Sequence, residues 1–269
     1  MSVKVALCQV CADKTPAENL ERIVDMVSKA AHKHADVVVF PEYCYCSPET
    51  PEEYKTLAEP VNGKYAAEIC KTAKKNNINI IAGSFLENDS GKIYNTCLFV
   101  NRNGNIIGKY RKIHLMKAMD YDESKYVSYG DCMAVFDTDI GRIGIMVCYD
   151  LRFPELARSM VINGADIIFV PAEFPVGSPL PSRTDHWDLL VRSAALYNTT
   201  YVAAVNQYGR IKNENLFGRS CVVDPWGTVI ASASNREEII YADIDFDYQK
   251  TIREKLGVLK NRRPNMYSL

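Results

Sequence analysis

The sequence has little of what metal centres and nucleic-acid surfaces require. Only four histidines and two tryptophans occur among 269 residues, and 32 lysines and arginines are balanced by 33 aspartates and glutamates. A formal net charge of −1 provides no broad basic field, so we expect neither nucleic acid nor a membrane as a partner. The longest uncharged stretch, residues 193–209, is broken by asparagine, threonine and glutamine, which excludes a transmembrane helix there.

Signals for export and several familiar enzyme loops are also missing. The N-terminus runs directly into a strand-like pattern without the layout of a signal peptide, so we expect a cytoplasmic protein with reduced thiols. No Gly-x-Ser-x-Gly elbow and no Gly-x-Gly-x-x-Gly loop occurs, and residues 104–109 are one residue short of a P-loop. The pairs Cys8-x-x-Cys11 and Cys44-x-Cys46 lack a matching second pair, so we expect buried structural thiols and no metal site.

Short apolar segments alternate with amphipathic ones along the whole chain. Several apolar segments are too continuously hydrophobic to have a solvated face, which indicates sheets covered on both sides. We expect strands at residues 3–10, 37–40, 78–83, 96–100, 143–148, 167–170, 201–205 and 220–223, helices at 17–33, 65–76, 155–163 and 185–198, and hairpin turns at 101–105 and 224–227. The pattern predicts one α/β domain over residues 1–269 with helices outside the sheets. It also predicts an ordered, pocket-shaping surface loop at the proline-rich residues 171–181.

Two polar residues stand at the ends of apolar strands. Glu42 follows the run Val-Val-Val-Phe-Pro, where partial burial raises a carboxyl pKa toward that of a general acid or base; an ion-paired structural role is about equally common. Cys148 ends the run Ile-Gly-Ile-Met-Val and precedes a turn and a helix that Pro154 can begin. A helix N-terminus or a lysine nearby would lower the pKa of this thiol, which favours a nucleophile, whereas most single cysteines are structural.

A basic cluster occupies residues 108–115 (Gly-Lys-Tyr-Arg-Lys-Ile-His-Leu). Clusters of this kind usually form a solvated face. His114 could pair with Cys148, but the sequence identifies no Asn or Asp to orient it, so we expect a histidine of the core or one that supports the site.

Together, three segments resemble the signature of the nitrilase superfamily of carbon–nitrogen hydrolases. They are Phe-Pro-Glu at 40–42, Tyr-Arg-Lys-Ile-His-Leu at 110–115 and Val-Cys-Tyr-Asp-Leu-Arg-Phe-Pro-Glu at 147–155, in the family's order. The likeness extends to residues 186–194, 217–220 and 224–227. The form of the cysteine segment and residues 241–245 are most similar to the branch that contains ω-amidases.

The resemblance implies a four-layer α-β-β-α sandwich that pairs into homodimers or larger homo-oligomers, with no cofactor and no metal. It implies that Cys148 is the nucleophile, Glu42 the general base and acid, and Lys112 the cation beside the tetrahedral intermediate. Glu123 matches the family's second glutamate, although on its own it is an ordinary solvated loop carboxylate. The backbone N–H of Tyr149 would stabilise the oxyanion together with Lys112.

The resulting hypothesis is an amidase of small linear amides that releases ammonia and a carboxylic acid through a thioester. An N-carbamoyl amine hydrolase, a nitrilase of the same superfamily and a non-catalytic binding relative are the alternatives. A free carboxylate on the substrate would need a cation. Lys117, Lys125 and Arg183 are candidates, although solvated charge is the simpler expectation for each. Tyr45, Phe174 and Trp187 could line a pocket or pack in the core.

Overall fold

The structure is a computed structural model that describes residues 2–118, 120–176 and 182–266. Its helices are α1 (Pro16–His32), α2 (Pro51–Thr56), α3 (Lys64–Asn76), α4 (Pro154–Ile162), α5 (Thr184–Asn198) and α6 (Phe246–Leu256), with 3-10 turns η1 (Glu123–Lys125), η2 (Cys148–Arg152) and η3 (Pro264–Met266).

Two large sheets contain most of the strands. The first has the order β17-β1-β2-β3-β5-β4, with β6 also paired to β5, and the second has the order β16-β15-β12-β11-β10-β9. The strands of the first are β1 (Ser2–Gln9), β2 (Val37–Val39), β3 (Asn79–Ile81), β4 (Phe85–Asp89), β5 (Lys92–Val100), β6 (Ile106–Arg111) and β17 (Glu238–Asp245). Those of the second are β9 (Ala134–Thr138), β10 (Gly141–Ile145), β11 (Ile167–Ala172), β12 (Tyr201–Asn206), β15 (Cys221–Val223) and β16 (Val229–Ser232). Two small ribbons pair β7 (Lys117–Ala118) with β8 (Tyr121–Asp122) and β13 (Tyr208–Ile211) with β14 (Glu214–Phe217).

The centre of each large sheet is parallel. Strands β1, β2 and β3 run in one direction, and so do β10, β11 and β12, while antiparallel strands complete both sheets. Strands β2, β11 and β12 are buried along their whole length. This confirms the expectation of sheets covered on both sides, because a strand buried on both faces has no need for alternating polar residues.

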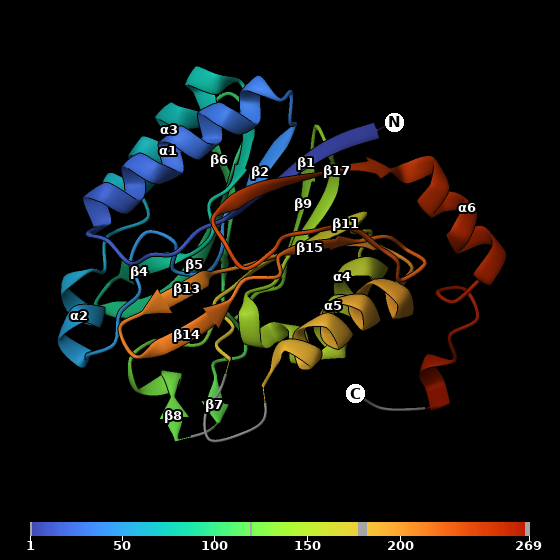
Figure 1. Ribbon diagram of the computed structural model, residues 1–269. Coiled ribbons are helices and arrows are strands. Elements are labelled where there is room, and N and C mark those ends of the chain that lie inside the picture. The colour runs from blue at the N-terminus through green and yellow to red at the C-terminus, as the bar shows by residue number, and fades with distance from the viewer. Residues whose placement is uncertain (1, 119, 177–181, 267–269) are drawn as a thin grey trace.

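Alternation along β1 shows how the layers stack. Val5 and Leu7 belong to the same buried cluster as Ile145 and Phe169 of the second sheet, whereas Cys8, on the opposite face, packs with residues of α1 and α3. Helices α1 and α3 therefore cover the first sheet, while α4 and α5 cover the second (Figure 1). The expected four-layer α-β-β-α sandwich is confirmed.

The local signals read from the sequence account for most element boundaries. Helix α1 starts at a capping box in which Thr15 and Glu18 bond to each other's backbone nitrogens, followed by Pro16 in the first turn. The strand expected at 143–148 ends earlier, at Ile145, and Cys148 lies instead in the turn η2. In the segment expected as a loop, residues 171 and 172 still belong to β11, and residues 177–181 lie outside the described residues.

Candidate active site

Polar side chains follow strands of both sheets where the strands end at a common edge. In the first sheet, Glu42 lies three residues beyond β2, and Lys112 directly follows β6. In the second sheet, Cys148 lies three residues beyond β10, and Glu173 directly follows β11. The carboxyl ends of parallel strands are where α/β folds commonly place ligands, and here the two sheets bring four chemically active side chains to one place.

Lys112 is an ammonium group buried between two carboxylates. Its Nζ lies 2.9 Å from Glu42 Oε1 and 2.9 Å from Glu123 Oε2, and all three side chains are at most 3% exposed. Burial lowers the pKa of Lys112, but Glu123, Glu42 and Cys148 outweigh it and leave this pKa well above its usual value. The expectation that the basic cluster is solvated is therefore wrong for Lys112, and so is the view of Glu123 as an ordinary loop carboxylate.

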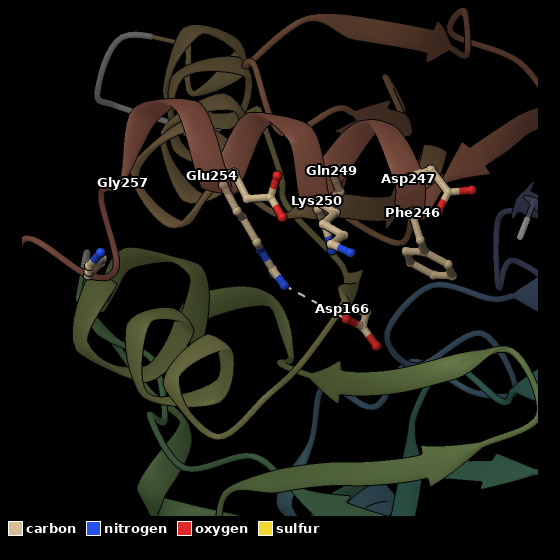
Figure 2. A pocket seen from close by; sticks show the side chains of 9 residues that line it. Asp166, Phe246, Asp247, Gln249, Lys250, Glu254 and Gly257 are labelled. Carbon is tan, nitrogen blue, oxygen red and sulfur yellow. Dashed lines mark ion pairs between the residues drawn. The ribbon is translucent and has the colours of Figure 1, made fainter.

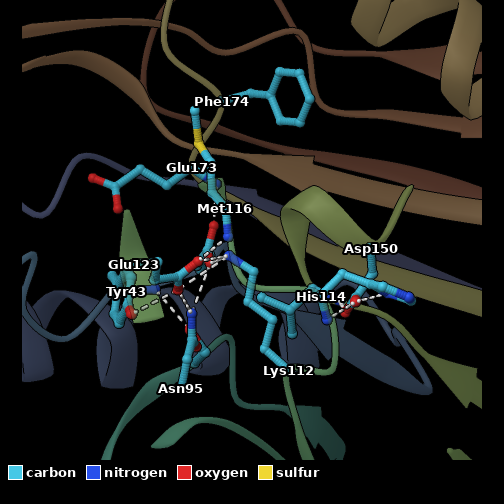
Figure 3. Close-up of polar contacts among 12 residues, drawn as sticks. Tyr43, Asn95, Lys112, His114, Met116, Glu123, Asp150, Glu173 and Phe174 are labelled. Atoms are coloured by element: carbon cyan, nitrogen blue, oxygen red, sulfur yellow. Dashed lines mark hydrogen bonds and ion pairs between the residues drawn. The ribbon is translucent and has the colours of Figure 1, made fainter. Parts of the chain in front are cut away.

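Two further residues complete the network around these carboxylates, and sequence reasoning missed both. Asn95 Nδ2 donates to Glu42 Oε1 at 2.8 Å and to Glu123 Oε1 at 3.3 Å. The hydroxyl of Tyr43 donates to Glu123 Oε1 at 3.4 Å (Figure 3). The only signal for this role was the polar Asn95 near the middle of β5, shortly before the apolar residues 97–100.

Two hydrogen bonds and one close backbone contact hold Glu42 and its turn. The backbone nitrogen of Glu173 donates to Glu42 Oε2 at 3.0 Å, and Gln207 Nε2 donates to the Glu42 carbonyl at 2.8 Å. Beneath this turn, Gly83 has a φ of +60°, and a Cβ there would lie 2.2 Å from the carbonyl oxygen of Pro41. Only glycine permits this approach, so position 83 must stay without a side chain for the turn that carries Glu42 to pack there.

Cys148 is buried beside this network in a strained conformation. Cys148 is only 7% exposed. Its φ is +49°, a left-handed value that costs about 1–3 kcal/mol in a residue with a Cβ. Burial raises the pKa of the Cys148 thiol well above its usual value, and the charge of Glu42 raises it further, whereas Lys112 opposes them. The direction is thus opposite to the lowered pKa expected from the sequence, because burial and Glu42 outweigh Lys112.

Asp150 holds the turn that carries Cys148. Its Oδ2 accepts from the hydroxyl of Tyr110 at 2.6 Å and from the backbone nitrogen of Val147 at 2.9 Å. Its Oδ1 accepts from the backbone nitrogen of His114 at 2.9 Å and lies 2.8 Å from His114 Nδ1 (Figure 3). His114 stacks on Phe153 with ring centroids 3.7 Å apart, so it supports the cysteine turn, as expected, through an aspartate partner that the sequence did not identify.

A cavity of about 360 Å³ opens onto these groups. Its lining residues are Glu42, Tyr43, Ser47, Pro48, Glu49, Tyr54, Lys112, Met116, Tyr121, Glu123, Cys148, Glu173, Pro175, Arg183, Ile211, Asn213, Glu214 and Leu216. A thiol, a base and an ammonium group in one small cavity can attack a carbonyl carbon, move a proton and stabilise an oxyanion.

Comparison with known proteins identifies the family of this chain. Residues 4–254 match the family described as carbon–nitrogen hydrolase. This chain belongs to the carbon–nitrogen hydrolase family. It is 36% identical to omega-amidase NIT2 of Xenopus tropicalis over 272 residues, which cover 99% of this chain and 97% of that protein.

Solved structures of the family agree. The NitFhit protein of C. elegans superimposes with a TM-score of 0.93 at 31% identity over 99% of this chain, which spans 66% of that protein. Saccharomyces cerevisiae Nit3, a member of branch 10 of the nitrilase superfamily, superimposes with a TM-score of 0.87 at 33% identity over 97% of both chains. The resemblance inferred from the three motifs is confirmed, and this carbon–nitrogen hydrolase is an amidase-like enzyme.

Of the residues considered for the pocket, only Arg183 departs from the sequence expectation. Arg183 is only 6% exposed and lines the cavity, so the expectation of a solvated charge is wrong there; Lys117 and Lys125 are exposed, as expected. Tyr45, Phe174 and Trp187 are absent from the cavity lining of this hydrolase and pack in the core.

A second hollow of the hydrolase lies under α6 and is lined by Asp166 and residues of the C-terminal segment (Figure 2). The Arg253 guanidinium there donates to the carbonyls of Ala165 and Thr199 at 3.1 and 2.9 Å, which gives it a structural role. Within the described residues no group of three or more His, Cys, Asp and Glu side chains is arranged to hold a metal ion. In the same part of the chain, no helix is long and apolar enough to cross a membrane.

Proposed function

We propose that the protein is an ω-amidase-like enzyme that hydrolyses the terminal amide of a small carboxylic acid, with Cys148 as the nucleophile. The observation that carries the proposal is the shared cavity in which the Cys148 thiol lies beside the Glu42–Lys112–Glu123 network. The full-length similarity to omega-amidase NIT2 supports the choice of amide over nitrile or carbamoyl substrates.

In the first half-reaction, Glu42 accepts the proton of the Cys148 thiol as the sulfur attacks the amide carbon. The raised pKa of the thiol fits this order, because a thiol that stays protonated in the free enzyme needs a base at the moment of attack. The C–N bond then breaks, Glu42 returns the proton to the leaving nitrogen, and ammonia departs from a thioester.

In the second half-reaction, Glu42 takes a proton from water as the water oxygen attacks the thioester carbon. The C–S bond breaks, the acid is released, and the proton returns to the Cys148 sulfur.

Stabilisation of the oxyanion falls to Lys112 and to the backbone N–H of Tyr149. Tyr149 lies in the first turn of η2, where an N–H has no partner inside the helix. One such donor is typically worth about 3–4 kcal/mol in the transition state. Glu123 holds the ammonium group of Lys112 in place and touches it with both carboxylate oxygens, at 2.9 and 3.2 Å.

Ammonia release tests the proposal directly. The panel contains short ω-amides of dicarboxylic and 2-oxo acids, N-carbamoyl amines and simple nitriles, and the wild type is compared with Cys148→Ala and with Cys132→Ala. Cys132 is an exposed thiol and serves as the matched control. We expect turnover of ω-amides that Cys148→Ala abolishes and Cys132→Ala retains. Turnover of carbamoyl amines or nitriles alone would keep the nucleophile and overturn the substrate class, and activity in Cys148→Ala would overturn the mechanism.

We also propose that residues 1–269 form one domain and that the enzyme is a homodimer or larger homo-oligomer in a reducing compartment such as the cytoplasm. One buried cluster joins the two sheets, which supports a single domain, and nine unpaired cysteines fit a reducing environment. Large apolar side chains of α4 and α5 remain exposed, among them Leu189 (68%), Tyr197 (61%) and Ile162 (48%). Sedimentation of the wild type and of Leu189→Glu tests the assembly: the wild type should sediment as an oligomer and the variant as a smaller species.

A further inference from the structure

Asn95, near the middle of β5, joins the two carboxylates that contact Lys112. Its Nδ2 donates to Glu42 Oε1 at 2.8 Å and to Glu123 Oε1 at 3.3 Å. Its carbonyl oxygen accepts from the backbone nitrogen of Lys112 at 2.9 Å. Asn95 is fully buried and is not among the residues that line the cavity, so it can act on the reaction only through the two carboxylates.

The orientation of this amide leaves its own oxygen unpaired. Among the described residues, Asn95 Oδ1 has no hydrogen-bond partner although it is buried, and a buried acceptor without a donor is unfavourable. A flipped amide would place Oδ1 against two carboxylate oxygens, which is worse. The two carboxylates therefore impose the orientation in which Nδ2 points at both of them.

The two oxygens of Glu42 differ in the lone pairs that remain available. Each carboxylate oxygen has two lone pairs. Glu42 Oε1 accepts from Asn95 Nδ2 at 2.8 Å and from Lys112 Nζ at 2.9 Å, so both of its lone pairs are engaged. In the part of the chain that the structure describes, Glu42 Oε2 has one donor, the backbone nitrogen of Glu173 at 3.0 Å. One lone pair of Oε2 therefore remains available to a proton.

Glu123 has no such opening. Its Oε1 accepts from Lys112 at 3.2 Å and from Asn95 at 3.3 Å. Its Oε2 accepts from Lys112 at 2.9 Å and from the backbone nitrogen of Met116 at 2.8 Å. Of the two carboxylates that Asn95 contacts, only Glu42 can accept a proton without the loss of a hydrogen bond, and only at Oε2.

We infer that Asn95 is a positioning residue that confines the proton of the reaction to Glu42 Oε2. The thiol of Cys148 lines the same cavity, and the charge of Glu42 acts on it. As the sulfur attacks, the S–H bond breaks and the proton binds to the free lone pair of Oε2, from which it moves to the leaving nitrogen. The inference rests on the proposed hydrolysis and adds the reason why Glu42, and not Glu123, is the base.

The test removes the amide and follows the pH dependence of ammonia release from succinamate. Asn95→Leu keeps the approximate shape of the side chain without the donor, so Glu42 Oε1 gains an open lone pair beside Lys112. A hydrogen bond to a carboxylate favours its charged form, so its loss should move the acid limb of kcat/KM to higher pH by about one unit. At the pH optimum, kcat should fall about tenfold, and KM should change little because Asn95 does not line the cavity.

Asn95→Asp replaces the donor by a group of equal size that can carry a negative charge. A like charge adds to the loss of the hydrogen bond, so the acid limb should move further than in Asn95→Leu. The other ionisable groups that face Glu42 are the same in every variant, so differences between the profiles report on position 95. These groups are Lys112, Glu123, Cys148, Glu173, Tyr43 and Tyr121.

The matched control is Asn79→Leu. Asn79 lies in β3 of the same sheet, is equally buried, and its Nδ2 also donates twice, to the carbonyl of Asp36 at 3.1 Å and to Asp139 Oδ1 at 3.0 Å. Its replacement should lower the Tm and leave the acid limb at the wild-type pH. Enzyme held at each pH and then assayed at pH 7.5 separates unfolding from a true shift of the limb.

Each contrary result has a distinct meaning. An acid limb at the wild-type pH in Asn95→Leu, or an equal shift in Asn79→Leu, would overturn the role of Asn95 and leave the amidase proposal intact. If Asn95→Leu does not fold, the isosteric Asn95→Asp decides between the same two results. No ammonia from succinamate or from the wider panel would overturn the proposed function and this inference with it.

Discussion

Both carboxylate oxygens of Glu123 contact the ammonium group of Lys112, at 2.9 and 3.2 Å, in a place where neither side chain is more than 3% exposed. Two opposite charges buried this deeply compensate each other's loss of hydration. With Glu42 on its other side, the lysine is held between two anions, and its position depends on both.

Replacement of Glu123 by glutamine should lower kcat by about 100-fold, since the ammonium group would then move toward Glu42 and away from the developing oxyanion. Loss of one partner of a buried ion pair should also lower the free energy of unfolding by about 3 kcal/mol. Steady-state ammonia release and guanidinium denaturation measure the two effects. Glu49→Gln, at the exposed rim of the same cavity, should change neither, and an active, fully stable Glu123→Gln enzyme would contradict the assignment.

A second prediction concerns the turn beneath the nucleophile. Asp150 has four hydrogen-bonding contacts through its two oxygens, and an asparagine can accept through only one oxygen. Asp150→Asn should therefore lower the free energy of unfolding by about 3 kcal/mol, because buried donors lose their acceptors, and should reduce kcat as Cys148 leaves its strained conformation. Urea denaturation and ammonia release measure these effects.

The control for that prediction is Asp137→Asn. Asp137 is 84% exposed and pairs with Arg142 on β9 and β10, and exposed pairs contribute about 0–1 kcal/mol. Its loss should leave stability almost unchanged. If the two aspartate variants were equally stable, the network would have no structural role.

Some residues of the site could be predicted from local sequence patterns, and others could not. Glu42 and Cys148 could be predicted because each follows an apolar parallel strand, and the ends of such strands mark ligand sites. Lys112 carried a weaker signal. Side chains along a strand point alternately to opposite faces, so Lys112 shares a face with the aromatic Tyr110 and not with Lys109. This alternation alone would have suggested that Lys112 points inward.

Glu123, Glu173 and Arg183 could not be predicted from local pattern. They lie in turns and connections, where side-chain direction follows from tertiary contacts rather than from periodicity. Only the family resemblance pointed to Glu123, and Arg183 looked like any loop cation because the sequence does not reveal which elements bury it.

A third prediction follows from Glu173. Burial and the charge of Glu42 raise the pKa of Glu173 to about 8, although Ser47 and Lys112 oppose this shift. An unfolded glutamate ionises near 4.5, so between that pH and about 8 the folded carboxyl keeps a proton that the unfolded chain releases. The folded state then binds more protons, and stability falls as the pH rises through this window.

Glutamine at position 173 cannot ionise and lacks this penalty. From pH 5 to pH 9, the Tm of the wild type should therefore fall more than that of Glu173→Gln, as measured by calorimetry in matched buffers. Parallel pH profiles for the two proteins would mean that Glu173 titrates at its ordinary pKa.

The last prediction concerns the proton on Cys148. The charge of Glu42 raises the pKa of the thiol in the free enzyme, so Glu42→Gln should lower that pKa while it removes the base that hydrolysis needs. Each unit of decrease raises the thiolate fraction at pH 7.5 about tenfold. Alkylation of Cys148 by iodoacetamide should thus be faster in Glu42→Gln than in the wild type, although ammonia release is lost.

Peptide mass spectrometry follows the two thiols separately, with the exposed Cys132 as the internal reference for reagent reactivity. The rate of alkylation of Cys148, divided by that of Cys132, should rise in Glu42→Gln. In Lys112→Met the same ratio should fall below the wild-type value, because the positive charge that lowers the thiol pKa is gone. Slower alkylation of Cys148 in Glu42→Gln would instead mean that Glu42 already holds the proton in the free enzyme, so that the thiolate is present before substrate binds.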